Sequence, residues 1–253
     1  MKIVSFIFGL ILGSFLNVCI HRIPRGESIV HPASSCPRCG AKIRFYDNVP
    51  LLSYVLLLGR CRSCRSPISP RYPIVEALTG LLSLALFSKF GPDPRYLFSL
   101  LFCASLLVIS FIDLDHKIIP DYISFPGILL GLVGSALGIF HVSWLESLLG
   151  ILCGGGFLFL TAIVFQWLTG KQGMGGGDVK LIAMIGAWMG WKSLPFIILI
   201  SSITGILIGG TGLLVAGKGY RAKIPFGPFL SLGALVYFFF GSEILRWYVG
   251  ILN

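Results

Sequence analysis

The hydrophobic and polar positions of this chain fall into long blocks, without the short period of a strand or of an amphipathic helix. Eight stretches are almost entirely apolar, and polar segments separate them. A helix needs roughly 20 mainly apolar residues to cross the hydrocarbon core of a bilayer. The expected spans cover residues 3–20, 73–90, 96–112, 122–140, 144–168, 179–191, 194–215 and 229–249.

The sequence therefore predicts an all-α polytopic membrane protein with about eight transmembrane helices. The sixth stretch is short, so it is expected to tilt or to continue into the preceding glycine-rich loop, and seven spans remain an alternative. Composition agrees, because 55% of the residues are hydrophobic, 12% are charged and the mean hydropathy is +0.89, outside the range of soluble domains. No small-residue cleavage site follows the first stretch, which is therefore expected to be a retained span.

The basic residues predict the orientation of these spans. If the loops alternate between the two sides, 15 of the 20 Lys and Arg residues fall on one side and 5 on the other. The positive-inside rule makes the rich side cytoplasmic and both termini external. The net charge of +10 then follows from topology, with attraction to anionic membrane lipid as a by-product. Nucleic-acid binding is not expected, because the dense basic segment lacks interleaved aromatic residues.

Two aspartates stand at the ends of apolar stretches, where a carboxylate is costly. Burial of a charged side chain at the bilayer centre costs about 2.5–3.5 kcal/mol on insertion scales, so such residues are usually functional. The third span is expected to end at Asp113 and the sixth to begin at Asp178, both at the cytoplasmic face. Two close carboxylates can share one proton, so that one acts as a base toward water during peptide hydrolysis. Proton or ion coupling in a transporter is the alternative use, and the pair alone favours neither.

The residues around the two aspartates receive separate interpretations. Three consecutive glycines, at positions 175–177, precede Asp178 and are expected to adopt conformations closed to other residues and to approach a substrate closely. Asp115 and Asp121 are interpreted as helix-end residues. Asp121 follows Pro120 and is expected to be the N-cap of the fourth span.

Four of the seven cysteines form two Cys-x-x-Cys pairs in the long polar segment after the first span. The pairs are Cys36 with Cys39 and Cys61 with Cys64, and 21 residues separate them. This spacing is typical of a tetrahedral four-cysteine zinc site. Disulfides are the alternative, which a reducing cytoplasm disfavours. A segment of roughly 50 residues has too small a core to fold securely alone, so a metal ion would stabilise it.

The order of several sequence blocks resembles that of the bacterial type IV prepilin peptidases, also called leader peptidase and N-methyltransferase enzymes. These are intramembrane aspartic proteases of the GxGD type. The likeness extends over nearly the whole chain. It rests on residues 13–18, 21–24, both cysteine pairs with 71–76, 112–116 with 120–121, 173–180, and 224–228.

The resemblance implies two activities. One is cleavage of a prepilin or pseudopilin leader at the cytoplasmic membrane face by Asp113 and Asp178. The other is methylation of the new N-terminal amine with S-adenosylmethionine. It also implies four parts of the chain: a first span at 1–20, a zinc-binding segment at 21–72 associated with methyl transfer, a second span and external loop at 73–95, and a membrane aspartic peptidase domain at 96–253. The site of S-adenosylmethionine, the particular pilin and the oligomeric state stay open.

Substrate contacts are expected from acidic groups, because by resemblance the leaders are short and basic. The candidates are Glu27, Asp47, Glu76, Asp115 and Asp121, with the backbone at Gly175 and Gly177. Each acid has an alternative role as a helix cap or ion-pair partner. Two other functions stay open: a peptidase without methyl transfer, and an ion-coupled transporter with a structural zinc module, although no convincing internal repeat of the kind found in transporters is present.

Overall fold

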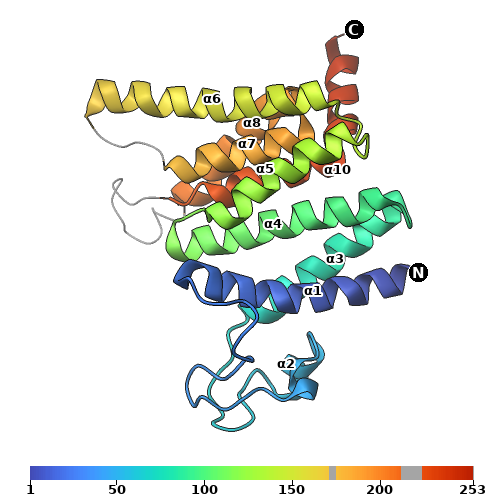
Figure 1. The fold of residues 1–253 in the computed structure, drawn as a ribbon, viewed down its shortest axis with the longest axis vertical. Helices are drawn as coiled ribbons and strands as arrows, with labels where there is room; N and C mark the ends of the chain where they lie inside the picture. The colour runs from blue at the N-terminus through green and yellow to red at the C-terminus, as the bar shows by residue number, and fades with distance from the viewer. Residues whose placement is uncertain (171–174, 212–223, 253) are drawn as a thin grey trace. The chain divides into compact units, whose positions relative to one another are not determined.

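The protein is all-helical in the computed structural model, which describes residues 1–170, 175–211 and 224–252. A helix covers all or most of the described part of each expected apolar stretch (Figure 1). Strand-like contacts in the described residues are two isolated bridges, Ser35 with Lys42 and Arg60 with Pro67. The long helices are α1 (Lys2–Arg22), α3 (Arg71–Phe90), α4 (Pro94–His116), α5 (Asp121–Ala136), α6 (Trp144–Thr169), α7 (Gly176–Met189), α8 (Leu194–Thr204), continued by a π-helical turn at Gly205–Gly210, and α10 (Gly227–Leu252).

Five helical segments in the described part of the chain are long and apolar enough to cross a membrane. Helix α5 and the Gly227–Gly241 part of α10 are apolar but shorter, and α7 has only 14 residues. The end of the expected span at 194–215 lies outside the described residues, as do Lys171, Lys218, Arg221 and Lys223. The all-α, multi-pass membrane fold is therefore confirmed.

The chain divides into two compact units, Met1–Val108 and Ile109–Asn253, with the boundary inside α4. In the first unit α1 packs on α3 through small residues. A Cβ atom at Gly9 would lie 2.5 Å from the Ser83 Cβ, and one at Gly13 would lie 2.7 Å from the Glu76 Cα. The Ser83 hydroxyl donates to the Ser5 carbonyl oxygen at 2.6 Å. Helices surrounded by lipid have no hydrophobic driving force to associate. Close backbone approach and hydrogen bonds between the helices stabilise their packing instead.

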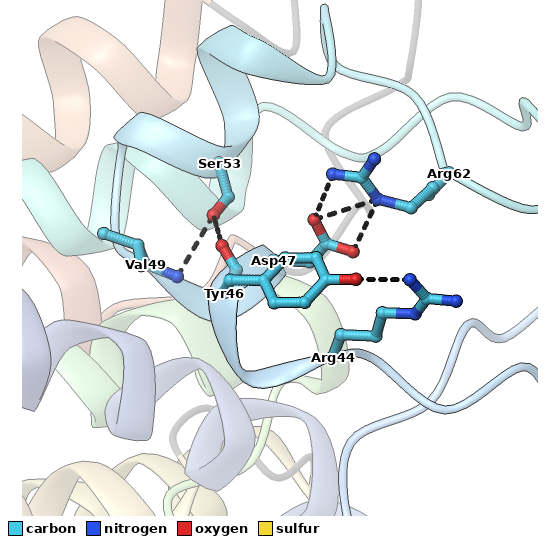
Figure 2. Close-up of polar contacts among 6 residues, drawn as sticks. All are labelled: Arg44, Tyr46, Asp47, Val49, Ser53 and Arg62. Carbon is cyan, nitrogen blue, oxygen red and sulfur yellow. Dashed lines mark hydrogen bonds and ion pairs between the residues drawn. The ribbon is translucent and has the colours of Figure 1, made fainter.

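The segment between α1 and α3 is polar and has little regular structure. It contains short helices at Ile23–Arg25, Phe45–Asn48 and Leu52–Leu56, the last of which is α2. Polar contacts hold its middle part together, as Figure 2 shows: the Ser53 hydroxyl accepts from the Val49 N–H at 3.1 Å and donates to the Tyr46 carbonyl oxygen at 3.0 Å.

The second unit is built around α7, which packs against α5 and α6 (Figure 1). Helices α6 and α7 approach closely at Gly150 and Gly186, where a Cβ atom on either residue would lie 2.2 Å from the other's carbonyl oxygen. On the α5 side, the Trp188 indole N–H donates to the Gly127 carbonyl oxygen at 2.7 Å. Helices α8 and α10 form a second pair in this unit. The packing fixes the position of the first turn of α7, which carries Asp178.

Candidate active site

Asp113 lies in the last turn of α4, and its side chain is buried. Its Oδ2 atom accepts a hydrogen bond from the Gly227 backbone N–H at 2.9 Å. Gly227 is the first residue of α10, and the first N–H groups of a helix have no partner within the helix. A Cβ atom on residue 227 would lie 2.8 Å from the same Oδ2 atom. Glycine is therefore the residue that lets this N–H reach the carboxylate.

Asp178 lies in the first turn of α7 and is partly exposed. Its carboxylate is close enough to that of Asp113 for the two charges to interact. The structure thus brings together, within one compact unit, two acids from separate helices. Each charge disfavours ionisation of the other carboxyl group, so one can stay protonated and serve as an acid while the other serves as a base on one substrate.

The glycines before Asp178 do not have the backbone conformations that were expected, whereas their close approach to a substrate stays a prediction. Gly175 is the N-cap of α7 with φ −75° and ψ 140°, and Gly175, Gly176 and Gly177 all lack the positive φ that only glycine adopts easily. Gly177 is required by packing, because a Cβ atom there would lie 2.9 Å from the Ile119 Cβ. The expectation of unusual backbone conformations was wrong for these three residues. Gly173 and Met174, from the same sequence block, lie outside the described residues.

The acids proposed as leader contacts fall into different environments. Asp115 and Glu27 are exposed. Asp121 is not the N-cap of α5: Pro120 has that position, and Asp121 is the first helical residue, without a capping hydrogen bond. Its Oδ1 atom instead accepts from Lys180 Nζ at 2.6 Å. Pro120 can be the N-cap because its extended backbone, with ψ 131°, turns the chain into the helix without a side-chain acceptor.

Asp47 forms an ion pair within the cysteine segment. Both of its oxygens accept from the Arg62 guanidinium, at 2.6–3.1 Å (Figure 2). This hydrogen bonding holds the pKa of Asp47 below its ordinary value. The Arg62 and Arg44 guanidinium groups also lie over the Tyr46 ring, at 5.6 and 5.7 Å from its centroid. For Asp47 the ion-pair alternative is therefore the one observed.

Glu76 is the candidate acid with the most enclosed side chain. It lies in the second turn of α3 and is 8% exposed. Its Oε2 atom accepts from the Leu51 backbone N–H at 2.9 Å. Sequence analysis predicted Glu76 as a leader contact but did not predict that it lies against α1.

The four cysteines of the two pairs converge on one point. The sulfur atoms of Cys36, Cys39, Cys61 and Cys64 lie within 4.8 Å of one another, and such a group can hold a metal ion. The Cys36 and Cys64 sulfurs are 3.9 Å apart. Tetrahedral sulfur ligands at about 2.3 Å from a zinc ion are separated by about 3.8 Å. The donor set thus fits one tetrahedral metal.

The two pairs are presented by turns of the same kind. After the first pair, the Gly40 N–H donates to the Cys36 carbonyl oxygen at 2.9 Å; after the second, the Arg65 N–H donates to the Cys61 carbonyl oxygen at 3.0 Å. Gly40 and Arg65 both have left-handed backbones, with φ 69° and φ 59°. The sequence shows the special turn only at the first pair, because only there is the left-handed residue a glycine.

Without a metal, the cysteine thiols of this centre differ in pKa. Backbone N–H groups of Cys39 and Arg38 act on the Cys36 sulfur and lower its pKa to about 6. An Ala41 backbone hydrogen bond favours the Cys39 thiolate, but desolvation and the neighbouring sulfurs outweigh it and raise its pKa to about 11. Hydrogen bonds from Ser66 also lower the pKa of Cys64. The Cys36 thiolate is therefore favoured near neutral pH, and a bound cation would favour the thiolate form of all four cysteines, since zinc binds thiolates.

Sequence analysis did not identify two residues whose contacts the structure shows, Gly227 beside Asp113 and Asn17 between α1 and α3. Gly227 belongs to the block at 224–228, whose Pro-Phe-Gly-Pro signal indicates a turn but not the acid it contacts. Asn17 belongs to the block at 13–18 and is buried against α3, where its side-chain nitrogen donates to the Tyr72 carbonyl oxygen at 3.1 Å. A polar residue within an apolar stretch was the available signal for Asn17.

Comparison with known proteins agrees with this architecture. Residues 7–90 match the bacterial peptidase A24 N-terminal domain, and residues 100–210 match the type IV leader peptidase family. The prepilin leader peptidase/N-methyltransferase of Aeromonas hydrophila is 40% identical over 269 residues, covering 96% of this chain and 92% of the relative. That of Legionella pneumophila is 41% identical over 275 residues, covering 99% and 95%. That of Pseudomonas aeruginosa is 38% identical over 268 residues, covering 97% and 92%. No solved structure matches the chain. The chain belongs to the type IV leader peptidase family.

Proposed function

We propose that this enzyme removes the leader of type IV prepilins or pseudopilins and then methylates the new N-terminal amine with S-adenosylmethionine. The observation that supports the peptidase activity is the approach of Asp178 to Asp113, with the Gly227 N–H holding Asp113 in place. The names of the three relatives, each a prepilin leader peptidase/N-methyltransferase, support both activities. The basic residues support placing the reaction at the cytoplasmic face of a bacterial inner membrane.

Cleavage follows from the chemistry of two carboxyl groups that share a proton. The ionised carboxylate removes a proton from a water molecule, whose oxygen attacks the scissile carbonyl carbon. The protonated partner stabilises the carbonyl oxygen and supplies a proton, and the amide nitrogen leaves as an amine. Neither a serine nor a cysteine nucleophile is needed.

The metal of the cysteine centre is proposed to be a structural zinc ion. Four sulfur ligands close the coordination shell, so no position is left for water or substrate. Bound zinc would supply folding free energy to a segment that has few buried apolar side chains.

The test combines the purified protein with a prepilin, and mass spectrometry follows the product with and without S-adenosylmethionine. We expect loss of the leader in both reactions and the additional mass of one methyl group only with the donor. Asp113→Asn and Asp178→Asn should each abolish cleavage. Cleavage without methylation would leave a peptidase alone, and an unchanged prepilin would contradict the proposal and favour the transporter alternative.

A further inference from the structure

A cavity of about 940 Å³ lies within the first unit, between the cysteine segment, the end of α1 and the start of α3. This volume is within the range of small-molecule sites, about 300–1,000 Å³. The lining combines basic side chains, including Arg38, Lys42 and Arg71, with a few acids. The lining carboxylates differ: Asp47 is paired with Arg62, Glu27 is exposed, and Glu76 is buried.

Glu76 is held in the wall of the cavity by neutral groups. Leu51 donates its N–H to one carboxylate oxygen, and Ser14 is a further hydrogen-bonding neighbour. No basic side chain of the described residues forms an ion pair with Glu76. A buried carboxylate without a cationic partner is costly. The position of Glu76 therefore suits a cation brought by a ligand.

Asn17 gives an independent sign of a ligand in the same wall. It lines the cavity and is 4% exposed. Its side-chain nitrogen donates to Tyr72, whereas its Oδ1 atom is buried and has no hydrogen-bond partner. A buried polar atom without a partner costs about 1–3 kcal/mol, so this acceptor is placed to receive a donor that the protein itself does not supply.

Gly13 explains why these two side chains can share one wall. Only a residue without a Cβ atom allows α1 to pass so close to the Glu76 backbone. Ser14, which follows Gly13 directly, and Asn17, one turn further along α1, then line the same cavity as Glu76. The two sequence blocks at 13–18 and 71–76 thus form one polar wall.

We propose that this cavity is the methyl-transfer site, in which Glu76 and Asn17 bind the protonated α-amine of the cleaved substrate and Glu76 accepts its proton. The proposal rests on the methyl-transfer part of the proposed function. The cavity residues fit the methyl donor as well: the basic side chains of the lining suit its carboxylate, and the remaining volume suits its nucleoside. When bound, S-adenosylmethionine supplies an electrophilic methyl group.

The reaction requires a proton acceptor on the side of the amine. An α-amine has a pKa of about 7.7–8.0 and is mostly protonated at neutral pH, so it has no free lone pair. Transfer of one proton to the Glu76 carboxylate frees that pair. The amine nitrogen then bonds to the methyl carbon, the carbon–sulfur bond breaks, and its electron pair remains on the sulfur, which becomes a neutral thioether. The sulfonium of the donor needs no base, which favours the amine as the partner of Glu76.

The decisive variant is Glu76→Gln, which keeps the shape and an oxygen that accepts from Leu51. We expect kcat for methylation of a pre-cleaved peptide to fall by about 100-fold or more, as for loss of a general base. Zinc content should be unchanged, and any loss of leader cleavage, which a contact of Glu76 with the leader would cause, should be far smaller than the loss of methylation. The remaining methylation rate should rise about tenfold per pH unit up to roughly pH 8, because solvent must then deprotonate the amine. A merely structural role would not produce this pH profile.

A binding measurement separates the amine from the methyl donor. With the demethylated donor product present, the unmodified protein should bind a free-amine peptide more tightly than its N-acetylated form, and Glu76→Gln should bind both equally. The affinity for S-adenosylmethionine itself should change by less than about threefold. Asp93→Asn, a carboxylate-to-amide change in the same unit whose acid pairs with Arg95 outside the cavity, is the matched control and should behave as the unmodified protein.

The outcomes distinguish this inference from the proposed function. If the unmodified protein neither binds the donor nor methylates, methyl transfer itself fails. If the unmodified protein methylates and Glu76→Gln methylates equally well, only the role of Glu76 is overturned. The same holds if Glu76→Gln loses affinity for the methyl donor but keeps its preference for the free-amine peptide. Should Glu76→Gln lose zinc or cleavage through misfolding, Glu76→Asp takes its place: partial methylation with amine selectivity supports the proposal, and full activity or equal binding of both peptides contradicts it.

Discussion

At the scale of single residues, the contact between Gly227 and Asp113 decides how one catalytic candidate is held. A Cβ atom at position 227 would overlap the end of the Asp113 carboxylate, which can rotate away at little cost in stability. Displacement of a reacting group by about 1 Å can cost 10²-fold in rate. We therefore expect Gly227→Ala to lower kcat for leader cleavage by about 10- to 100-fold, measured with a purified prepilin, while the protein stays folded.

Gly156→Ala is the matched control, because a Cβ atom at Gly156 meets no other atom within 4 Å. It should cleave at the normal rate. Normal cleavage by Gly227→Ala would show that the hydrogen bond to Asp113 has no role in the reaction.

The difference between Asp113 and Gly227 also shows what the sequence can predict at this scale. A carboxylate next to an apolar stretch is conspicuous, so Asp113 and Asp178 could be selected from composition and topology. Gly227 acts through a backbone N–H across 114 positions of chain, and no side-chain pattern marks such a contact. The incorrect N-cap at Asp121 has a related cause, since its carboxylate pairs with Lys180, a partner far away in the sequence.

At the scale of elements, the two turns that carry the cysteine pairs have the same hydrogen bonds but different residues at the left-handed position. A left-handed backbone costs about 1–2 kcal/mol for a residue other than glycine. We expect Gly40→Ala to destabilise the metal-loaded segment by about 1 kcal/mol, seen as a roughly fivefold loss of zinc affinity in a chelator competition. No neighbour within 4 Å would clash, so the backbone is the sole cause.

Arg65→Gly should have little effect, because relief of the left-handed cost is offset by about 0.5–1 kcal/mol of extra backbone entropy in the unfolded chain. A loss of zinc affinity in Arg65→Gly equal to that in Gly40→Ala would contradict this account.

The ion pair between Asp47 and Arg62 predicts a pH dependence of the same segment. Because the pair lowers the folded-state pKa of Asp47, its contribution to stability is present above the unfolded value of about 3.9. It is lost as the pH falls through the folded value. A carboxyl carbon titration by NMR should place the Asp47 midpoint below 3.9 and move it upward in Arg62→Gln. An unchanged midpoint in that variant would show that another group holds the pKa down.

The convergence of the four cysteines was predictable, because two Cys-x-x-Cys pairs at this spacing are typical of a single four-cysteine metal site. The cavity wall formed by Asn17 and Glu76 was not, since it depends on the close packing of α1 on α3 at Gly13. A glycine in an apolar stretch indicates close helix packing, but it does not name the partner helix.

At the scale of the whole molecule, the two groups of candidate functional residues belong to different compact units. Asp113, Asp178 and Gly227 belong to the second unit, whereas the cysteine centre, Asn17 and Glu76 belong to the first. The same division suggests that each activity can be lost without the other, provided that the helices stay inserted in the membrane.

We therefore expect two variants to show opposite defects. Asp113→Asn should abolish leader cleavage but still methylate a pre-cleaved peptide, because the methyl-transfer residues are untouched. Cys36→Ser should release zinc, unfold the cysteine segment and abolish methylation, while the long apolar helices remain inserted, since lipid burial supplies their stability independently of the metal. Mass spectrometry of the products measures cleavage and methylation, and metal analysis measures the zinc content. Insertion of the helices is measured by whether the protein stays in the membrane fraction during alkaline extraction. If Asp113→Asn also lost methylation of the pre-cleaved peptide, the two activities would share one centre. The separate cavity would then be the wrong place for methyl transfer.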